Sequence, residues 1–197
     1  MKTASGEVPG RCGDPMDQGV ACEAVLPLSW QAVAELPPEQ RLAALNGANE
    51  ALVRSCDGLE EPQRLLDESG DVAQELQRMD AKLNLLLELL AERLRPDGLP
   101  PERVLRFNAR GMCWESPEVP PGGTLLRLEC YLCARIPRPL VLFGRVVDSH
   151  APQDGGSRAV VEFLGLSSGL LDALERLVFR RHRREVAQLR GQRRGTE

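Results

Sequence analysis

The sequence predicts an α+β fold in which N-terminal helices, one of them long, precede a small antiparallel β-barrel closed by a C-terminal helix. A heptad pattern of apolar residues lies between residues 65 and 90, and a linker rich in Pro and Gly follows at 96–101. Beyond residue 102 apolar residues alternate along short segments, which is typical of strands. The predicted organisation is a disordered leader (1–22), a helical oligomerisation region (23–96), the barrel with its closing helix (97–190) and a tail (191–197).

Two helices of unequal strength are predicted before the barrel. Residues 24–30 form a first apolar patch in which Trp30 is the expected anchor. A helix with two prolines in its first turn and a moderately apolar face covers about 37–55. The longer helix starts between residues 61 and 71 and runs to about residue 95, where Pro and Gly stop it.

The long helix carries an apolar stripe with coiled-coil spacing. Its members recur at intervals of three, four or seven residues and are Leu65, Val72, Leu76, Met79, Leu83, Leu86 and Leu90. Leu87 and Leu89 widen the stripe beyond the seam of a dimer, which is typical of a bundle of more than two helices. We therefore expect self-association, as a homotetramer in preference to a dimer. The alternative is that the helix packs on residues 38–55 of its own chain.

Five short strands are predicted after the linker, at about 103–107, 111–115, 124–133, 139–148 and 158–164. Turn-forming Pro and Gly residues separate several of them. Such a set predicts a small barrel or a partly open sandwich. A final helix begins near Ser168, whose hydroxyl suits an N-cap, and runs to about Leu189 with its leucines against the strands.

The composition argues against an enzyme, a DNA-binding protein and a membrane-spanning protein. The formal net charge is −4, whereas generic DNA binding relies on excess cationic charge. No apolar run reaches the roughly 18 residues of a membrane span, and the start lacks an apolar export signal, so we expect a cytoplasmic protein with reduced cysteines. His150 and His182 have no sequence context for catalysis. Cys130 and Cys133, three residues apart in a predicted strand, point to opposite faces, so we expect no metal site.

An arginine cluster marks the end of the last helix. Its members are Arg180, Arg181, Arg183, Arg184, Arg190, Arg193 and Arg194. One interpretation is a solvated helix end whose cations stabilise the C-terminal dipole. The other is a contact with phosphate or with an acidic partner.

The barrel region resembles a PilZ domain, a bacterial module typically associated with cyclic di-GMP. The resemblance rests on four stretches in the family's order, VLRFNARGMCW (104–114), GTLLRL (123–128), LFGRVV (142–147) and VVEFL (160–164), followed by the last helix. Residues 26–30 and the heptad helix resemble the atypical, helix-extended group of the family, some members of which are tetramers. The resemblance implies a bacterial signalling protein with a role in motility, surface polysaccharide or virulence control.

In ligand-binding members of the family, two arginines of an RxxxR loop before the first strand hold the guanines and phosphates, and a [D/N]xSxxG motif follows. Aligning Gly111 with the motif glycine places Asn108 at the serine position and Arg106 at the Asp/Asn position, so only the glycine matches. Arg106 and Arg110 form an RxxxR string that overlaps this motif, and Arg103 adds a cation upstream. The ligand-binding candidates are Arg103, Arg106, Asn108, Arg110 and Gly111.

We therefore expect a non-enzymatic PilZ-type adaptor that has lost or weakened cyclic di-GMP binding and works through an unidentified protein partner. The alternative is a working cyclic di-GMP receptor that uses non-standard arginine contacts. A third interpretation is a coiled-coil structural protein with an unrelated β domain. No cofactor is expected, and cyclic di-GMP is the candidate ligand that the resemblance implies.

Overall fold

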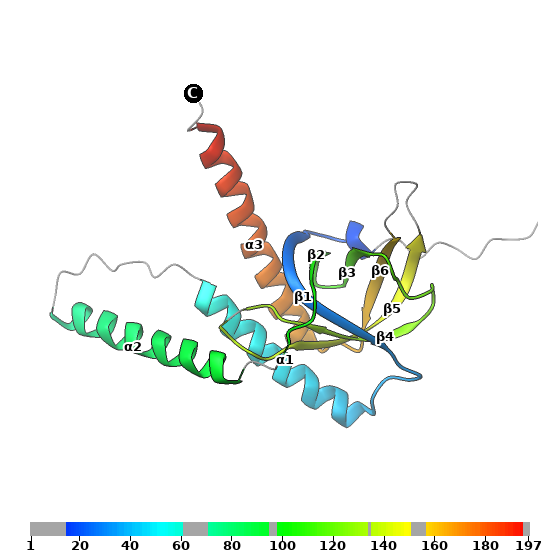
Figure 1. Cartoon of the computed structure of the whole chain (residues 1–197), viewed down its shortest axis with the longest axis horizontal. Coiled ribbons are helices and arrows are strands. Elements are labelled where there is room, and N and C mark those ends of the chain that lie inside the picture. Colours follow the sequence, from blue (N-terminus) through cyan, green and yellow to red (C-terminus); the bar gives the residue numbers. More distant parts are fainter. Residues whose placement is uncertain (1–14, 61–70, 95–97, 134, 151–156, 195–197) are drawn as a thin grey trace, which may run out of the picture.

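The computed structural model describes residues 15–60, 71–94, 98–133, 135–150 and 157–194. Their elements are η1 (Pro15–Asp17), β1 (Cys22–Ala32), α1 (Glu39–Glu60), α2 (Asp71–Leu94), β2 (Glu102–Phe107), β3 (Gly111–Ser116), β4 (Leu125–Cys130), β5 (Leu140–His150), β6 (Ser157–Leu164) and α3 (Ser168–Arg194). The strands close into an antiparallel barrel in the order β1-β2-β3-β6-β5-β4. Figure 1 shows α1 and α3 beside the barrel and α2 standing away from it. The predicted α+β fold with a small barrel is confirmed.

β1 is a barrel strand that was not predicted from the sequence. Its first half pairs with β2 up to Pro27, and its second half pairs with β4 from Leu28 onward. Pro27 lies where the strand changes partner, the place in a ladder where a missing amide hydrogen is best tolerated. Residues 22–32 therefore belong to the barrel, and their assignment to the helical region 23–96 is wrong.

The predicted leader is also partly wrong. Met16 of η1 is buried and packs with Cys113 and Val160 on the outer side of the barrel. Residues 15–22 are therefore part of the folded unit, whereas residues 1–14 lie outside the described residues.

Smaller differences concern the ends of elements. β4 ends at Cys130, short of the predicted 133, and the Tyr131 amide beyond it donates to Pro27 O of β1 at 3.1 Å. α1 continues through Gly58 to Glu60, and α3 continues to Arg194.

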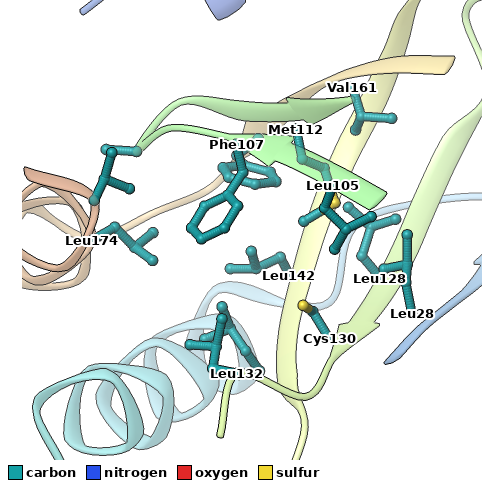
Figure 2. Close-up of a cluster of buried hydrophobic side chains, with 14 of the residues drawn as sticks. Leu28, Leu105, Phe107, Met112, Leu128, Cys130, Leu132, Leu142, Val161 and Leu174 are labelled. Carbon is teal, nitrogen blue, oxygen red and sulfur yellow. The ribbon is translucent and has the colours of Figure 1, made fainter. Parts of the chain in front are cut away.

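The barrel core is apolar and continues beneath the two packed helices. In Figure 2, Leu105, Leu128 and Leu142 lie inside the barrel, and Leu174 of α3 and Leu132 lie at one end of it. Each fully buried side chain of this kind contributes about 1.5–3 kcal/mol to folding.

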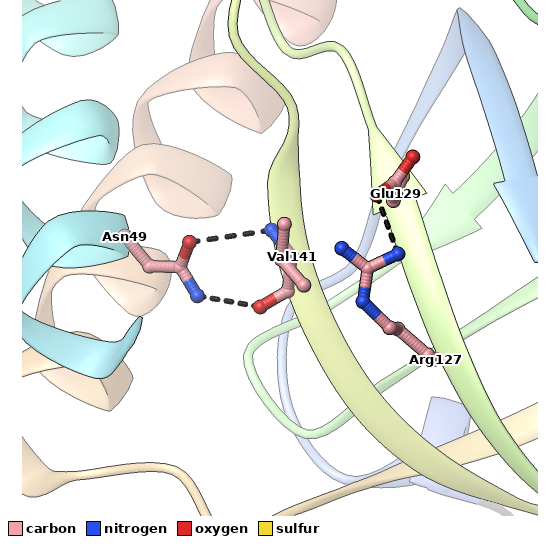
Figure 3. A network of polar contacts seen from close by, with 4 residues as sticks. All are labelled: Asn49, Arg127, Glu129 and Val141. Carbon is pink, nitrogen blue, oxygen red and sulfur yellow. Dashed lines mark hydrogen bonds and ion pairs between the residues drawn. The ribbon is translucent and has the colours of Figure 1, made fainter. Parts of the chain in front are cut away.

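An amide side chain of α1, Asn49, bonds directly to the backbone of β5. β5 begins to pair with β6 only at Phe143, so on that side the backbone of Val141 has no strand partner among the described residues. Asn49 satisfies both groups: its Nδ2 donates to Val141 O at 2.6 Å, and its Oδ1 accepts from Val141 N at 3.2 Å (Figure 3). On the neighbouring strand, Arg127 and Glu129 form an ion pair at 2.5 Å.

Candidate functional site

The turn between β2 and β3 is organised by Asn108, which is 1% exposed. Its Oδ1 accepts hydrogen bonds from Arg110 N at 2.8 Å and from Gly111 N at 2.9 Å. Its Nδ2 donates to Pro15 O at 2.6 Å and to Gln18 O at 3.4 Å. An Asn amide has two acceptor lone pairs and two donor hydrogens, so all of this capacity is used within the chain. Asn108 therefore closes the turn and ties the segment before β1 to it.

Gly111 is required by close packing. A Cβ at this position would collide with the Val161 carbonyl oxygen of β6 and would lie 3.1 Å from the Pro15 Cβ. Only a residue without a side chain lets β3 approach both β6 and η1 this closely. The glycine that matches the family motif therefore has a structural reason to be there that is independent of any ligand.

The three candidate arginines do not all come together. Along β2 the side chains alternate, so Arg103 points inward on the side of Leu105, and Arg106 is exposed on the outer face. Arg103 also lies at the end of β2 away from the turn, and its Nη1 donates to Ser116 Oγ at 2.9 Å. The structure thus brings together Asn108, Arg110 and Gly111, and it places Arg103 elsewhere.

A cavity of about 380 Å³ lies between this turn and α3. Its walls come from three segments distant in the sequence, and the lining residues include Gln18, Val20, Asn108, Arg110, Arg176 and Phe179. The contributions from the segment before β1 and from α3 were not predicted from the sequence. Recognition of residues 22–32 as a strand would have indicated the first of them.

The family is settled by comparison with known proteins. A family model described as "Atypical PilZ domain, cyclic di-GMP receptor" matches residues 52–191. This chain belongs to the atypical PilZ family. Among solved structures, it is similar to a pathogenic protein from Xanthomonas campestris described as a new tetrameric PilZ domain self-assembled via an unusual helical bundle. The two share 30% identity with a TM-score of 0.67, over 85% of this chain and 90% of that chain. No curated protein matches.

The first strand of the PilZ barrel in this chain is β1. The RxxxR loop of ligand-binding members precedes the first strand, so it is expected before β1 and not before β2. The described residues directly before β1, 15–21, contain no arginine. Arg103, which lies within β2, is therefore not in the position that the family motif requires.

α2 exposes the predicted apolar stripe of this PilZ protein. The exposed fractions are 57% for Leu76, 55% for Met79, 58% for Leu83, 55% for Leu86 and 54% for Leu90. Residues 38–55 of the same chain do not cover these side chains, so the alternative of packing within one chain is wrong for the described part of the stripe. Leu65 lies outside the described residues, and the side chain of Val72 is not described. Nowhere in the described chain is there a helix with the length and apolarity needed to cross a membrane.

Part of the arginine cluster on α3 has structural contacts. Arg180 pairs with Asp57 of α1 at 3.1 Å. Arg181 donates to Leu132 O at 3.0 Å, and its guanidinium lies 5.9 Å from the centre of the Phe107 ring. These two cations therefore fasten α3 to the rest of the fold, which neither interpretation from the sequence included.

Cys130 and Cys133 lie in different surroundings from those predicted. Cys130 ends β4 and Cys133 lies in the loop beyond it, so their assignment to one strand is wrong. Burial raises the pKa of the Cys130 thiol from 9.0 to about 12, partly opposed by Arg181, which disfavours the thiolate form that a nucleophile needs. Within the described ranges, no three His, Cys, Asp or Glu side chains gather as metal ligands.

Proposed function

We propose that this atypical PilZ protein is a non-enzymatic adaptor, assembled as a tetramer through α2, in which cyclic di-GMP binding is lost or weakened. The observation that carries the proposal is the stripe on α2, whose five described members are each more than half exposed in a single chain. Apolar side chains that are exposed side by side along one helix face mark interaction surfaces. The helical bundle described for the related Xanthomonas protein supports four copies as the assembly.

The turn supports weakened nucleotide binding. A guanine or phosphate that used Asn108 would have to replace hydrogen bonds that already satisfy both ends of this amide. The described segment before β1 offers no guanidinium for stacking on a base. The adaptor would therefore act by presenting several barrels to a protein partner in the cytoplasm.

One observation favours the second candidate function, a receptor with non-standard contacts. Arg110 and Arg176 both line the cavity at the turn, and two guanidinium groups beside apolar walls can bind a phosphate and a flat base. Glu175 lines the same cavity and opposes an anionic ligand.

The two functions are separated by measuring mass and nucleotide binding in one buffer. Light scattering should return about four times the 21.7 kDa of one chain, and a mass of one chain would refute the adaptor assembly. Calorimetry with cyclic di-GMP should show binding no tighter than about 100 µM. Micromolar binding that is lost in Arg110→Ala and Arg176→Ala, but kept in the exposed α1 control Arg41→Ala, would establish the receptor.

A further inference from the structure

Another cavity lies at the end of the barrel away from α3. β2 runs from one end of the barrel to the other. Its Phe107 contacts Arg181 of α3, and its Arg103 lines this second cavity of about 430 Å³. In Figure 2, Leu28, which also lines the cavity, lies at the end of the labelled core opposite Leu174. Mouths of β-barrels are recurrent places for small ligands.

Arg103 lines this cavity, and the described residues do not use all of the hydrogen-bonding capacity of its guanidinium group. Its Nη1 donates to Ser116 Oγ at 2.9 Å, whereas its Nε is buried and has no acceptor among the described residues. A buried donor without an acceptor is costly, and in a native fold it calls for an explanation. Because the Ser116 hydroxyl accepts from Arg103, its own hydrogen remains available to a ligand. The two side chains together offer donors that suit an oxyanion.

The remaining walls restrict the kind of anion. Leu28 and the half-buried Trp30 supply an apolar and aromatic surface. The exposed carboxylate of Glu118 lines the rim and offsets the charge of Arg103, which disfavours a doubly charged phosphate more than a single charge. We propose that the barrel mouth binds a small monoanionic carboxylate attached to a flat apolar group, with Arg103 and Ser116 as its donors.

This site is independent of the proposed adaptor function and of the family's nucleotide motif. None of the residues lining the mouth lines the cavity at the β2–β3 turn. A chain that does not assemble, or one that binds cyclic di-GMP at the turn, could still bind a carboxylate here.

The experiment uses fluorine NMR of the full chain labelled with 5-fluorotryptophan. The sequence has two tryptophans: Trp30 lines the mouth, Trp114 is in the core, and Trp30→Phe assigns the two signals. Phenylacetate is the probe, phenylacetamide is its neutral match, and phenyl phosphate is the dianion. We expect phenylacetate to shift the Trp30 signal saturably, more than that of Trp114, with a Kd in the millimolar range. Phenylacetamide and phenyl phosphate should bind more weakly.

Arg103→Gln should weaken phenylacetate binding by about tenfold or more, because a charge-assisted hydrogen bond is lost. Arg106→Gln is the matched control, since it removes a cation from the outer face of the same strand and should leave the affinity unchanged. Equal binding of acid and amide, no saturation by about 50 mM, or an unaltered affinity in Arg103→Gln would each overturn the proposal. If Arg103→Gln does not fold, the comparison of acid with amide on the unmodified chain decides the question.

Discussion

Leu83 and Leu85 of α2 provide a direct test of assembly through the stripe. Both are leucines of the same helix, and in a single chain they are 58% and 57% exposed. They differ in heptad position, because Leu83 belongs to the stripe at position a whereas Leu85 falls at position c, away from it. We expect Leu83→Ala to weaken the tetramer and Leu85→Ala to leave it nearly intact.

The magnitude follows from the surface that assembly can cover. Full burial of a leucine contributes about 1.5–3 kcal/mol, so covering the 58% of Leu83 that is exposed contributes about 0.9–1.7 kcal/mol per chain. Four copies give about 3.5–7 kcal/mol per tetramer. The midpoint concentration of a monomer–tetramer equilibrium follows the cube root of its dissociation constant, so it should rise about sevenfold to fiftyfold.

Sedimentation or light scattering of both variants from about 0.1 to 100 µM measures this midpoint. Thermal unfolding of the barrel serves as the control, and neither substitution should change it much, because both side chains are already exposed in the single chain. Equal effects of the two substitutions would refute a heptad seam, and no effect of either would refute α2 as the interface.

Three further predictions concern the barrel. Asn108→Ala should lower the free energy of unfolding by about 2–4 kcal/mol in denaturant titrations, because it leaves buried backbone groups of the turn and of η1 without partners. An unchanged unfolding midpoint would contradict the role of Asn108 in holding the turn together. Gly111→Ala should destabilise by about 1–3 kcal/mol or more through collision with Val161, whereas Gly122→Ala, with nothing within 4 Å of the added Cβ, should stay within about 0.5 kcal/mol. Burial raises the pKa of Cys130 to about 12 in the folded chain, so the unfolded chain loses this proton first as the pH rises. The contribution of the Cys130 thiol to the free energy of unfolding should therefore be complete below about pH 9 and should decline as the pH rises toward 12. At about pH 8, alkylation of Cys130 followed by mass spectrometry should be no faster than global unfolding.

Most of the barrel could be predicted from its alternating pattern, and β1 shows where that pattern fails. Residues 24–28 read Ala-Val-Leu-Pro-Leu, which lacks alternation and contains a proline, so nothing local predicts a strand. The structure supplies the reason: the strand changes partner after Pro27, from β2 to β4, and this change closes the barrel. A closure formed by residues about a hundred positions apart is a tertiary property.

The candidate site was predicted less completely because its decisive contacts involve main-chain atoms. Asn108 is held by the carbonyl oxygens of Pro15 and Gln18, and any residue type could supply those oxygens. No side-chain motif could therefore connect the two segments. The alternation along β2, by contrast, is visible in the sequence and places Arg103 and Arg106 on opposite faces, although both were grouped as ligand-binding candidates.

These hydrogen bonds to main-chain atoms also explain how the fold can remain stable if cyclic di-GMP binding has been lost. In this chain the turn is completed by an internal amide, and the segment before β1 is anchored to that amide through backbone atoms, so neither depends on a bound ligand for its hydrogen bonds. The stripe on α2, by contrast, is not satisfied within a single chain, because its apolar side chains are exposed until another surface covers them. The side chains that gain most from being covered are therefore those of α2, and this supports the proposal that the protein acts by assembly in preference to nucleotide binding.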